Sequence, residues 1–134
     1  MKVYIAGPMT KFAAQNFNFP EFYKAQALLE MAGHTVLNPA RADIEERRMT
    51  YVPHEGRLVP APTFTLPLVM RRDFVMIADC EAIVLLPGWE ESTGARKELR
   101  VATEDFGMPA FVLGQDSTGW PTLEPYAQID VSSD

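Results

Sequence analysis

Residues 82–88 read Ala-Ile-Val-Leu-Leu-Pro-Gly, a continuous apolar run that stops at a Pro-Gly pair. A short run of this kind is typical of a strand that is buried on both faces, and Pro-Gly commonly forms the turn that ends such a strand. The sequence on both sides of the run has helical spacing. A buried strand between two helices predicts a parallel sheet that is covered by helices.

The two helices beside this strand have recognisable ends. The helix before it is expected to begin after Thr65, which can act as its N-cap, and to continue through Ile77. The helix after it is expected to begin at Ser92 or Thr93, either of which can cap it, and to end before Gly107.

The alternation of strands and helices continues along the rest of the chain. A further helix is expected from Asn18 to Gly33, because apolar residues recur there at helical spacing. The other expected strands are Val3–Ala6, Thr35–Leu37 and Ala110–Leu113. We therefore expect one α/β domain over residues 1–134, with a flavodoxin-like or Rossmann-like parallel sheet covered by helices.

Residues 44–64 do not fit this alternation. They mix charged residues with Pro53, Pro60 and Pro62 and show no sustained period. A long segment without structure of its own is usually functional or mobile. We expect this segment to be irregular and to serve as a lid or as an arm between subunits.

The composition excludes several classes of function. A net charge of −6 argues against binding to a nucleic-acid polymer, which needs a basic surface. The single cysteine, Cys80, excludes an internal disulfide framework and suits a reducing compartment. No secretory signal and no long apolar run is present, so we expect a cytoplasmic protein with no membrane partner.

Two carboxylates occupy matching positions on the helices that enclose residues 82–86. Glu98 and Asp73 each lie about 60° to the same side of an apolar stripe, at about 100° per helical residue. The stripes are Ala95, Leu99, Ala102 and Phe106 on the later helix, and Leu66, Met70, Phe74 and Ile77 on the earlier one. Buried carboxylates need a partner or a function, because desolvation raises their pKa and costs stability.

Ordinary ion pairing is the alternative explanation for both carboxylates. Glu98 could pair with a basic residue of its own helix, and Asp73 could pair with Arg71 or Arg72 at the surface. The two histidines, His34 and His54, lie far apart in the sequence, which makes a metal site or a catalytic triad improbable. The glycines match neither a P-loop nor a dinucleotide fingerprint, so no metal or organic cofactor is expected.

Four segments together resemble the nucleoside 2-deoxyribosyltransferase-like superfamily, especially its short, phage-associated members. They are Tyr4–Thr10 (Y-I-A-G-P-M-T), Asn16–Pro20, Asp73–Asp79, and Leu86–Glu90 followed by Ser92, Gly94, Ala95 and Glu98. The resemblance covers most of residues 1–113, and the last segment is its most specific part. Residues 44–64 and the C-terminal tail lie outside it.

The resemblance implies roles for individual residues. Glu98 takes the position of the nucleophile that attacks the sugar, Asp73 that of the group that contacts or protonates the departing base, and Tyr4 that of the residue that holds the nucleophile. An ionised Glu98 and an Asp73 of raised pKa would divide this work. The implied substrate-binding residues are Gly7, Pro8, Met9, Thr10, Asn18, Trp89, Ser92 and Gly94.

Ser92 departs from the pattern of the enzymes that act on free nucleosides. They carry an aspartate here that binds the 5′-hydroxyl, whereas the related nucleoside 5′-monophosphate N-glycosidases have a serine. A serine at a helix start favours a 5′-phosphate, although it could also be a plain N-cap. The resemblance thus implies cleavage or exchange of an N-glycosidic bond in a (deoxy)nucleoside 5′-monophosphate.

Two alternatives stay open for the function. One is 2-deoxyribosyl transfer between free nucleosides, and the other is a non-catalytic protein that binds or senses nucleotides. Members of the superfamily are commonly oligomers, so the resemblance also implies at least a homodimer. A phage-encoded member would act in the host cytoplasm.

Overall fold

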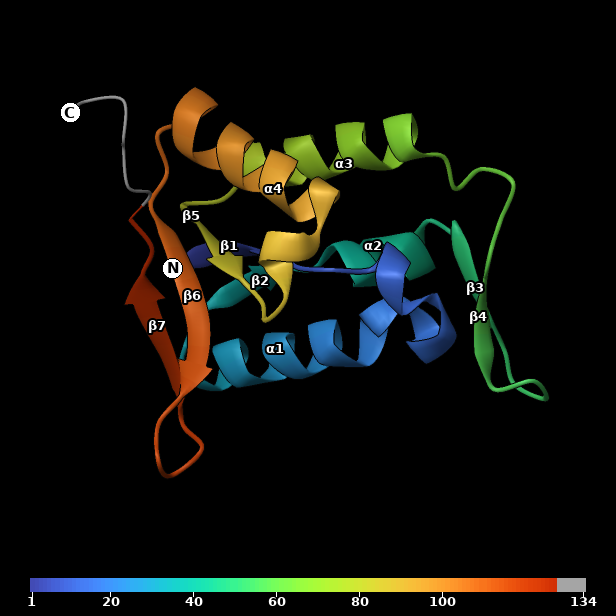
Figure 1. The fold of residues 1–134 in the computed structure, drawn as a ribbon, viewed down its shortest axis with the longest axis horizontal. Coiled ribbons are helices and arrows are strands. Elements are labelled where there is room, and N and C mark those ends of the chain that lie inside the picture. Colours follow the sequence, from blue (N-terminus) through green and yellow to red (C-terminus); the bar gives the residue numbers. More distant parts are fainter. Residues whose placement is uncertain (128–134) are drawn as a thin grey trace.

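The computed structural model describes residues 1–127 and has a five-stranded sheet at its centre. The strands lie in the order β2-β1-β5-β6-β7 (Figure 1). Four of them are parallel, and β7 joins the edge of the sheet antiparallel to β6. Their bounds are β1 Lys2–Ala6, β2 Thr35–Leu37, β5 Ala82–Leu85, β6 Ala110–Gln115 and β7 Pro121–Pro125.

Helices cover both faces of this sheet. Figure 1 shows α3 and α4 above the sheet and α1 below it. The helices are α1 Phe19–Met31, α2 Pro39–Glu45, α3 Leu66–Ala78 and α4 Thr93–Arg100, which a π-helical turn extends over Val101–Asp105. Short 3-10 helices cover Thr10–Asn18 (η1) and Trp89–Glu91 (η2). The expected flavodoxin-like or Rossmann-like α/β fold is confirmed.

The central strands divide the apolar core between the two faces of the sheet. Alternate residues of β1 point to opposite sides, so Val3 and Ile5 pack in the cluster with α1, and Tyr4 and Ala6 in the cluster with α3 and α4. β5 divides in the same way. Tyr4 is therefore the polar residue that β1 places beneath α3 and α4.

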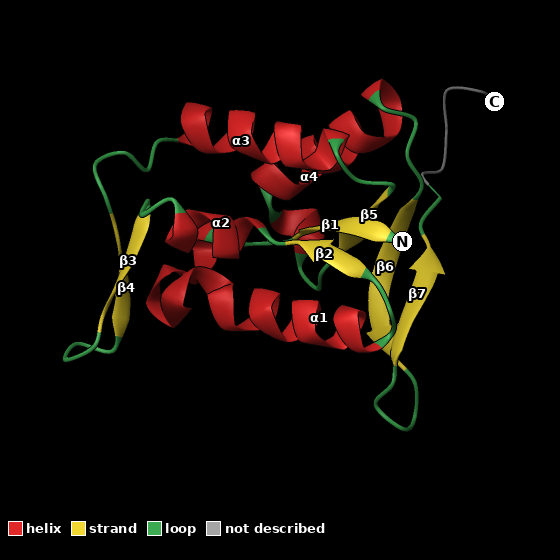
Figure 2. Ribbon diagram, turned by 180° about the vertical axis from the view of Figure 1, so that it is seen from behind, coloured by secondary structure: helices red, strands yellow, loops and turns green. Residues whose placement is uncertain are grey.

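The expectation of an irregular segment at 44–64 is wrong for two stretches. Strands β3 (Met49–Val52) and β4 (Arg57–Pro60) form an antiparallel hairpin, which makes a sheet of its own. Figure 2 shows the hairpin at the end of the molecule away from β7. Met49 and Leu58 turn inward and join the core cluster of α1, which anchors the hairpin.

Both predicted apolar stripes need correction. On α3 the buried line is Val69, Asp73 and Ile77, while Leu66 is 63% exposed. Asp73 thus lies on the buried line and not beside it, because its polar partner lies in the interior. On the later helix Phe106 is 44% exposed, since the wider π turn rotates the chain out of the α-helical period.

Within residues 1–127, no helix has both the length and the apolar character that crossing a membrane requires.

Candidate functional site

A cavity of about 250 Å³ opens at the carboxyl ends of β1 and β5. This is the edge at which parallel α/β sheets bind ligands. Its walls come from the turn after β1, the start of α4 and one side of α3. The lining residues predicted from the sequence are Gly7, Pro8, Met9, Thr10, Asp73, Ser92, Gly94 and Glu98.

Two glycines allow the turns beside this cavity to pack closely. A Cβ on Gly7 would lie 2.9 Å from the Cβ of Leu86, so a side chain there would push β1 and β5 apart. Gly88 has a φ of +87°, and a Cβ there would lie 3.2 Å from Cγ of Pro8. Because Gly7 and Gly88 have no side chains, the two turns can pack closely and hold Pro8 in the cavity wall.

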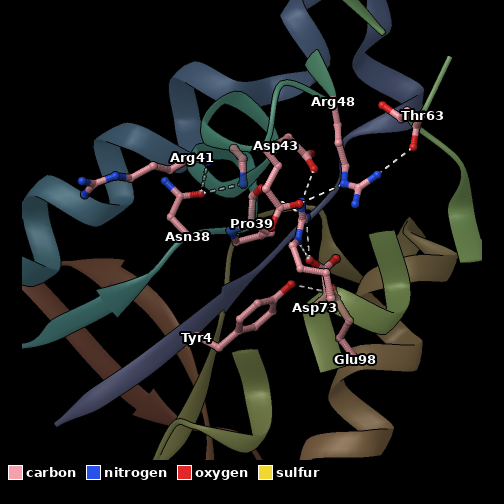
Figure 3. Close-up of polar contacts among 12 residues, drawn as sticks. Tyr4, Asn38, Pro39, Arg41, Asp43, Arg48, Thr63, Asp73 and Glu98 are labelled. Atoms are coloured by element: carbon pink, nitrogen blue, oxygen red, sulfur yellow. Dashed lines mark hydrogen bonds and ion pairs between the residues drawn. The ribbon is translucent and has the colours of Figure 1, made fainter. Parts of the chain in front are cut away.

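Glu98 lies on the floor of the cavity, where its carboxylate accepts a hydrogen bond from the hydroxyl of Tyr4 (Figure 3). Tyr4 is fully buried and Glu98 is 5% exposed. Burial and the charges of Glu98 and Asp73 raise the pKa of Tyr4 well above its usual range. The tyrosine therefore keeps its proton and remains a donor to Glu98.

Asp73 reaches the same floor from α3 and is paired with its neighbour in the chain. Nε and Nη2 of Arg72 donate to Oδ1 of Asp73 at 3.1 and 2.7 Å. The same guanidinium donates from Nη1 to Oδ1 of Asp43 at 2.6 Å and to Oε1 of Glu46 at 3.1 Å. The expected pairing of Asp73 with an arginine is present, but the pair is buried.

Burial governs the protonation of both carboxyl groups. It raises the pKa of Glu98 well above its usual range, and the charge of Asp73 raises it further. Burial also raises the pKa of Asp73, although here the charge of Arg72 opposes the rise. Two such groups side by side do not readily ionise together, so they titrate as a coupled pair.

Arg72 favours the charged form of Asp73, whereas burial and the charge of Asp73 both favour the protonated form of Glu98. The resemblance implied an ionised Glu98 and an Asp73 of raised pKa. Here the pKa of Asp73 is raised, and so is that of Glu98. Arg72 folds inward beside Asp73, which helical periodicity alone did not reveal.

The opposite wall is built from the start of α4. Oγ of Ser92 accepts a hydrogen bond from the amide of Ala95 at 3.1 Å, so Ser92 is the N-cap, as predicted. A Cβ on Gly94 would meet only Oγ of Ser92, at 4.0 Å, so protein packing does not require a glycine there. The missing side chain leaves room in the cavity beside the helix start.

Basic side chains also border this wall, and the sequence analysis did not single them out. Lys97 lines the cavity, and so does Lys11, which pairs with Glu91 across the mouth. Phe64, from the segment predicted to be irregular, lines the cavity as well. Asp43 was missed because α2 was not predicted, and Arg72 was expected only as a surface partner of Asp73.

Two predicted binding residues lie outside this cavity. Asn18 lines a separate cavity of about 380 Å³, and its Nδ2 donates to the carbonyl of Pro8 at 3.1 Å. Trp89 packs edge-on against Tyr126, with ring centroids 5.2 Å apart. Asn18 thus supports the turn after β1, and Trp89 packs the turn after β5 against Tyr126, the residue that follows β7.

Within the described residues, no group of three or more histidine, cysteine or acidic side chains is arranged to hold a metal ion. The chemistry available at the floor of the cavity is that of the two carboxyl groups and a tyrosine hydroxyl.

One protein family accounts for most of the chain. Its model, described as Domain of unknown function (DUF4406), matches residues 1–110. The match includes every residue that lines the cavity and ends at the first residue of β6. No curated protein matches the chain.

Proposed function

The chain belongs to DUF4406, a family of unknown function, and from its cavity we propose that it cleaves or exchanges the N-glycosidic bond of a (deoxy)nucleoside 5′-monophosphate. The observation that carries the proposal is the buried pair of Glu98 and Asp73, which share one face of the cavity. Buried carboxyls are costly even when they are hydrogen-bonded, and glycosidic cleavage is a reaction that uses two of them. The resemblance to the nucleoside 2-deoxyribosyltransferase-like superfamily supports the same assignment.

In the proposed first step the Glu98 carboxylate attacks the anomeric carbon. A bond forms between its oxygen and C1′, the C1′–N bond breaks, and the electron pair leaves with the base. Asp73 donates a proton to the base, because a nucleobase leaves poorly as an anion. The Tyr4 hydroxyl holds the attacking carboxylate in place.

The second step releases the sugar from Glu98. The oxygen of a water molecule bonds to C1′, the ester bond to Glu98 breaks, and the proton of the water returns to Asp73. If a second nucleobase takes the place of water, the same step transfers the sugar. Hydrolysis and transfer therefore use the same residues.

The start of α4 is the reason for proposing a monophosphate. Unpaired amides at a helix start attract anions, and the hydroxyls of Ser92 and Thr10 can donate to phosphate oxygens. Lys97 adds positive charge beside the helix start, whereas the charge of Lys11 is offset by its ion pair with Glu91. A carboxylate at position 92 would repel the phosphate, which is why the free-nucleoside transferase is the less favoured candidate.

The first test is release of base by Glu98→Gln. We expect the variant to lose at least three orders of magnitude in kcat/KM, about 4 kcal/mol of barrier, because the amide cannot act as the nucleophile. A panel of nucleosides and their 5′-monophosphates, with released base measured by chromatography, gives the rates.

Glu104→Gln is the matched control, because Glu104 is exposed on the same helix and its substitution removes the same charge. It should retain wild-type rates. Base release by Glu98→Gln within tenfold of the wild type would contradict the proposal, as would a wild-type protein that releases no base from any member of the panel.

A further inference from the structure

Asp43 is a buried carboxylate for which the proposed reaction has no use. It belongs to α2 and is fully inaccessible to solvent. Its Oδ1 accepts from Arg72 at 2.6 Å, while its Oδ2 has no hydrogen-bond partner among residues 1–127. A half-satisfied anion in the interior is costly, so its position calls for an explanation.

The guanidinium of Arg72 connects Asp43 to the carboxyl pair. Arg72 donates to Asp43 and to Asp73 from different nitrogens of one rigid, planar group. It also donates to the carbonyl of Pro39 at 3.4 Å and to Glu46, so α2 and the residue that caps it hold the guanidinium of this α3 residue in place. A change of charge at Asp43 therefore acts on Asp73 through Arg72.

We propose that Asp43 and Arg72 are positioning residues that set the pH range over which Asp73 and Glu98 share a single proton. Arg72 draws negative charge onto Asp73, and Asp43 offsets part of the positive charge of Arg72. This inference deepens the proposed function, on which its activity measurement rests.

The proposed reaction shows why this balance matters. Burial favours the protonated form of Glu98 and Arg72 favours the charged form of Asp73, whereas the attack needs Glu98 ionised and Asp73 protonated. As positive charge develops on the sugar beside Glu98, the proton passes from Glu98 to Asp73, and none is gained or lost. An arginine without its Asp43 counter-charge would hold Asp73 ionised and oppose the transfer.

Other charged and titratable groups face the carboxyl pair or Arg72, and none of them is substituted in the experiment that follows. They are Tyr4 from β1, Glu46 directly after α2, Lys97 from α4, and the ion pair of Lys11 and Glu91 in the cavity lining. Burial raises the pKa of Asp43 itself to about 6, so Asp43 carries its charge throughout the alkaline range.

The test compares Asp43→Asn with Arg72→Met. Removing the negative charge of Asp43 should move the alkaline limb of kcat/KM to lower pH, and removing the positive charge of Arg72 should move it to higher pH. We expect shifts of about 0.5–1 pH unit or more, the usual size of the effect of a nearby charge. Arg72→Lys, which keeps the charge, should stay closer to the wild type than Arg72→Met.

Opposite shifts distinguish this inference from a merely structural role, which would lower the activity of both variants without moving their limbs apart. Shifts in the same direction, or none, would overturn it. Asn keeps an oxygen that can accept from Arg72, so Asp43→Asn should fold and decides the matter even if Arg72→Met does not.

A second measurement does not depend on activity. Carbon-13 NMR of the side-chain carboxyls gives the titration midpoints of the pair, with Asp73→Asn and Glu98→Gln to assign the signals. If the midpoints move in opposite directions but no substrate is cleaved, the positioning role stands and the proposed reaction fails. If substrate is cleaved and the midpoints do not move, the reverse holds.

Discussion

Ser92 has a structural task that several other residues could perform equally well. Its Oγ caps α4 by accepting from the amide of Ala95, and Asp and Asn are N-caps of similar quality. The choice of a neutral cap at the wall of the cavity is therefore informative about the ligand. It leaves the helix start free to meet a negative charge.

Substitution of Ser92 tests the phosphate preference. We expect the wild type to favour a 5′-monophosphate over its nucleoside by tenfold or more in kcat/KM, because charge-assisted hydrogen bonds contribute about 1.5–3 kcal/mol each. Ser92→Asp should reverse this preference, since its carboxylate would lie against the phosphate.

Ser92→Asn is the matched control, because it keeps the cap and a similar side-chain volume without the charge. It should retain the preference for the monophosphate. A wild type that prefers the free nucleoside would move the assignment to the nucleoside transferase.

At the scale of elements, the join between η1, α1 and the β3–β4 hairpin has unusual backbone geometry. Asn16, Phe17 and Asn18 have φ values of +53°, +56° and +64°, a run of three left-handed residues. Oδ1 of Asn16 accepts from the amide of Leu58 at 3.0 Å and so ties this join to β4. The hairpin lies just before Phe64, which lines the cavity.

Two variants of Asn16 separate the hydrogen bond from the backbone conformation. Asn16→Gly loses the bond, at about 1 kcal/mol, but tolerates a positive φ. Asn16→Ala loses the bond and adds the cost of a left-handed alanine, at least about 1 kcal/mol more. Urea unfolding measures both differences.

Hydrogen exchange gives an independent measurement at the other end of the bond. The amide of Leu58 should exchange faster in both variants, because its acceptor is gone. Unchanged protection of this amide would show that other contacts hold the hairpin, and equal stability of the two variants would show that the left-handed backbone is not strained.

The elements differ in how far the sequence could predict them. β1, β2, β5 and β6, together with α1, α3 and α4, follow from apolar runs and helical periods of ordinary length. α2 has seven residues, and its signal, the Asn38 cap followed by Pro39, was taken as the end of a strand. The strands of the hairpin and β7 mix polar residues with prolines at or beside their ends and contain no apolar run, so local patterns did not reveal them.

The residues of the candidate site also differ in how far the sequence could predict them. Glu98 and Asp73 could be predicted because each stands near an apolar stripe of a long helix. Arg72 and Asp43 could not, because their contact joins residues 29 positions apart through a helix that was not expected. Trp89 and Asn18 were placed at the site by resemblance, but their contacts support the turns around it.

At the scale of the whole molecule, the buried carboxyl groups link stability to pH. Burial raises the pKa of Asp43 to about 6 and raises the pKa values of Glu98 and Asp73. Between about pH 4 and 6 the folded chain therefore holds protons that the unfolded chain has lost. The contribution of these groups is fully present below about pH 4 and is lost as the pH rises through their folded pKa values.

We accordingly expect a higher Tm at pH 5 than at pH 8. Glu98→Gln removes one of the groups that take up a proton on folding. The variant should therefore show a smaller difference in Tm between pH 5 and pH 8, and it should be more stable than the wild type at pH 8. A gain of about 1 kcal/mol corresponds to roughly 3 °C or more at this chain length. Calorimetry across this pH range measures it.

Glu104→Gln again serves as the control, since it removes an exposed negative charge and leaves the buried pair unchanged. It should reproduce the wild-type dependence on pH. A Tm that is equal at pH 5 and pH 8, or a Glu98→Gln protein that is less stable than the wild type at pH 8, would contradict the linkage.

The two outer strands of the main sheet limit how this protein can aggregate. β2 forms one edge with three residues, and β7 forms the other with Pro121 at its start and Pro125 at its end. Proline has no N–H group, and a strand of three residues offers few unpaired N–H and C=O groups. Neither edge is therefore a good template for a strand from another molecule. Growth of the sheet from chain to chain, the first step toward fibrils, therefore meets a blunt edge on each side.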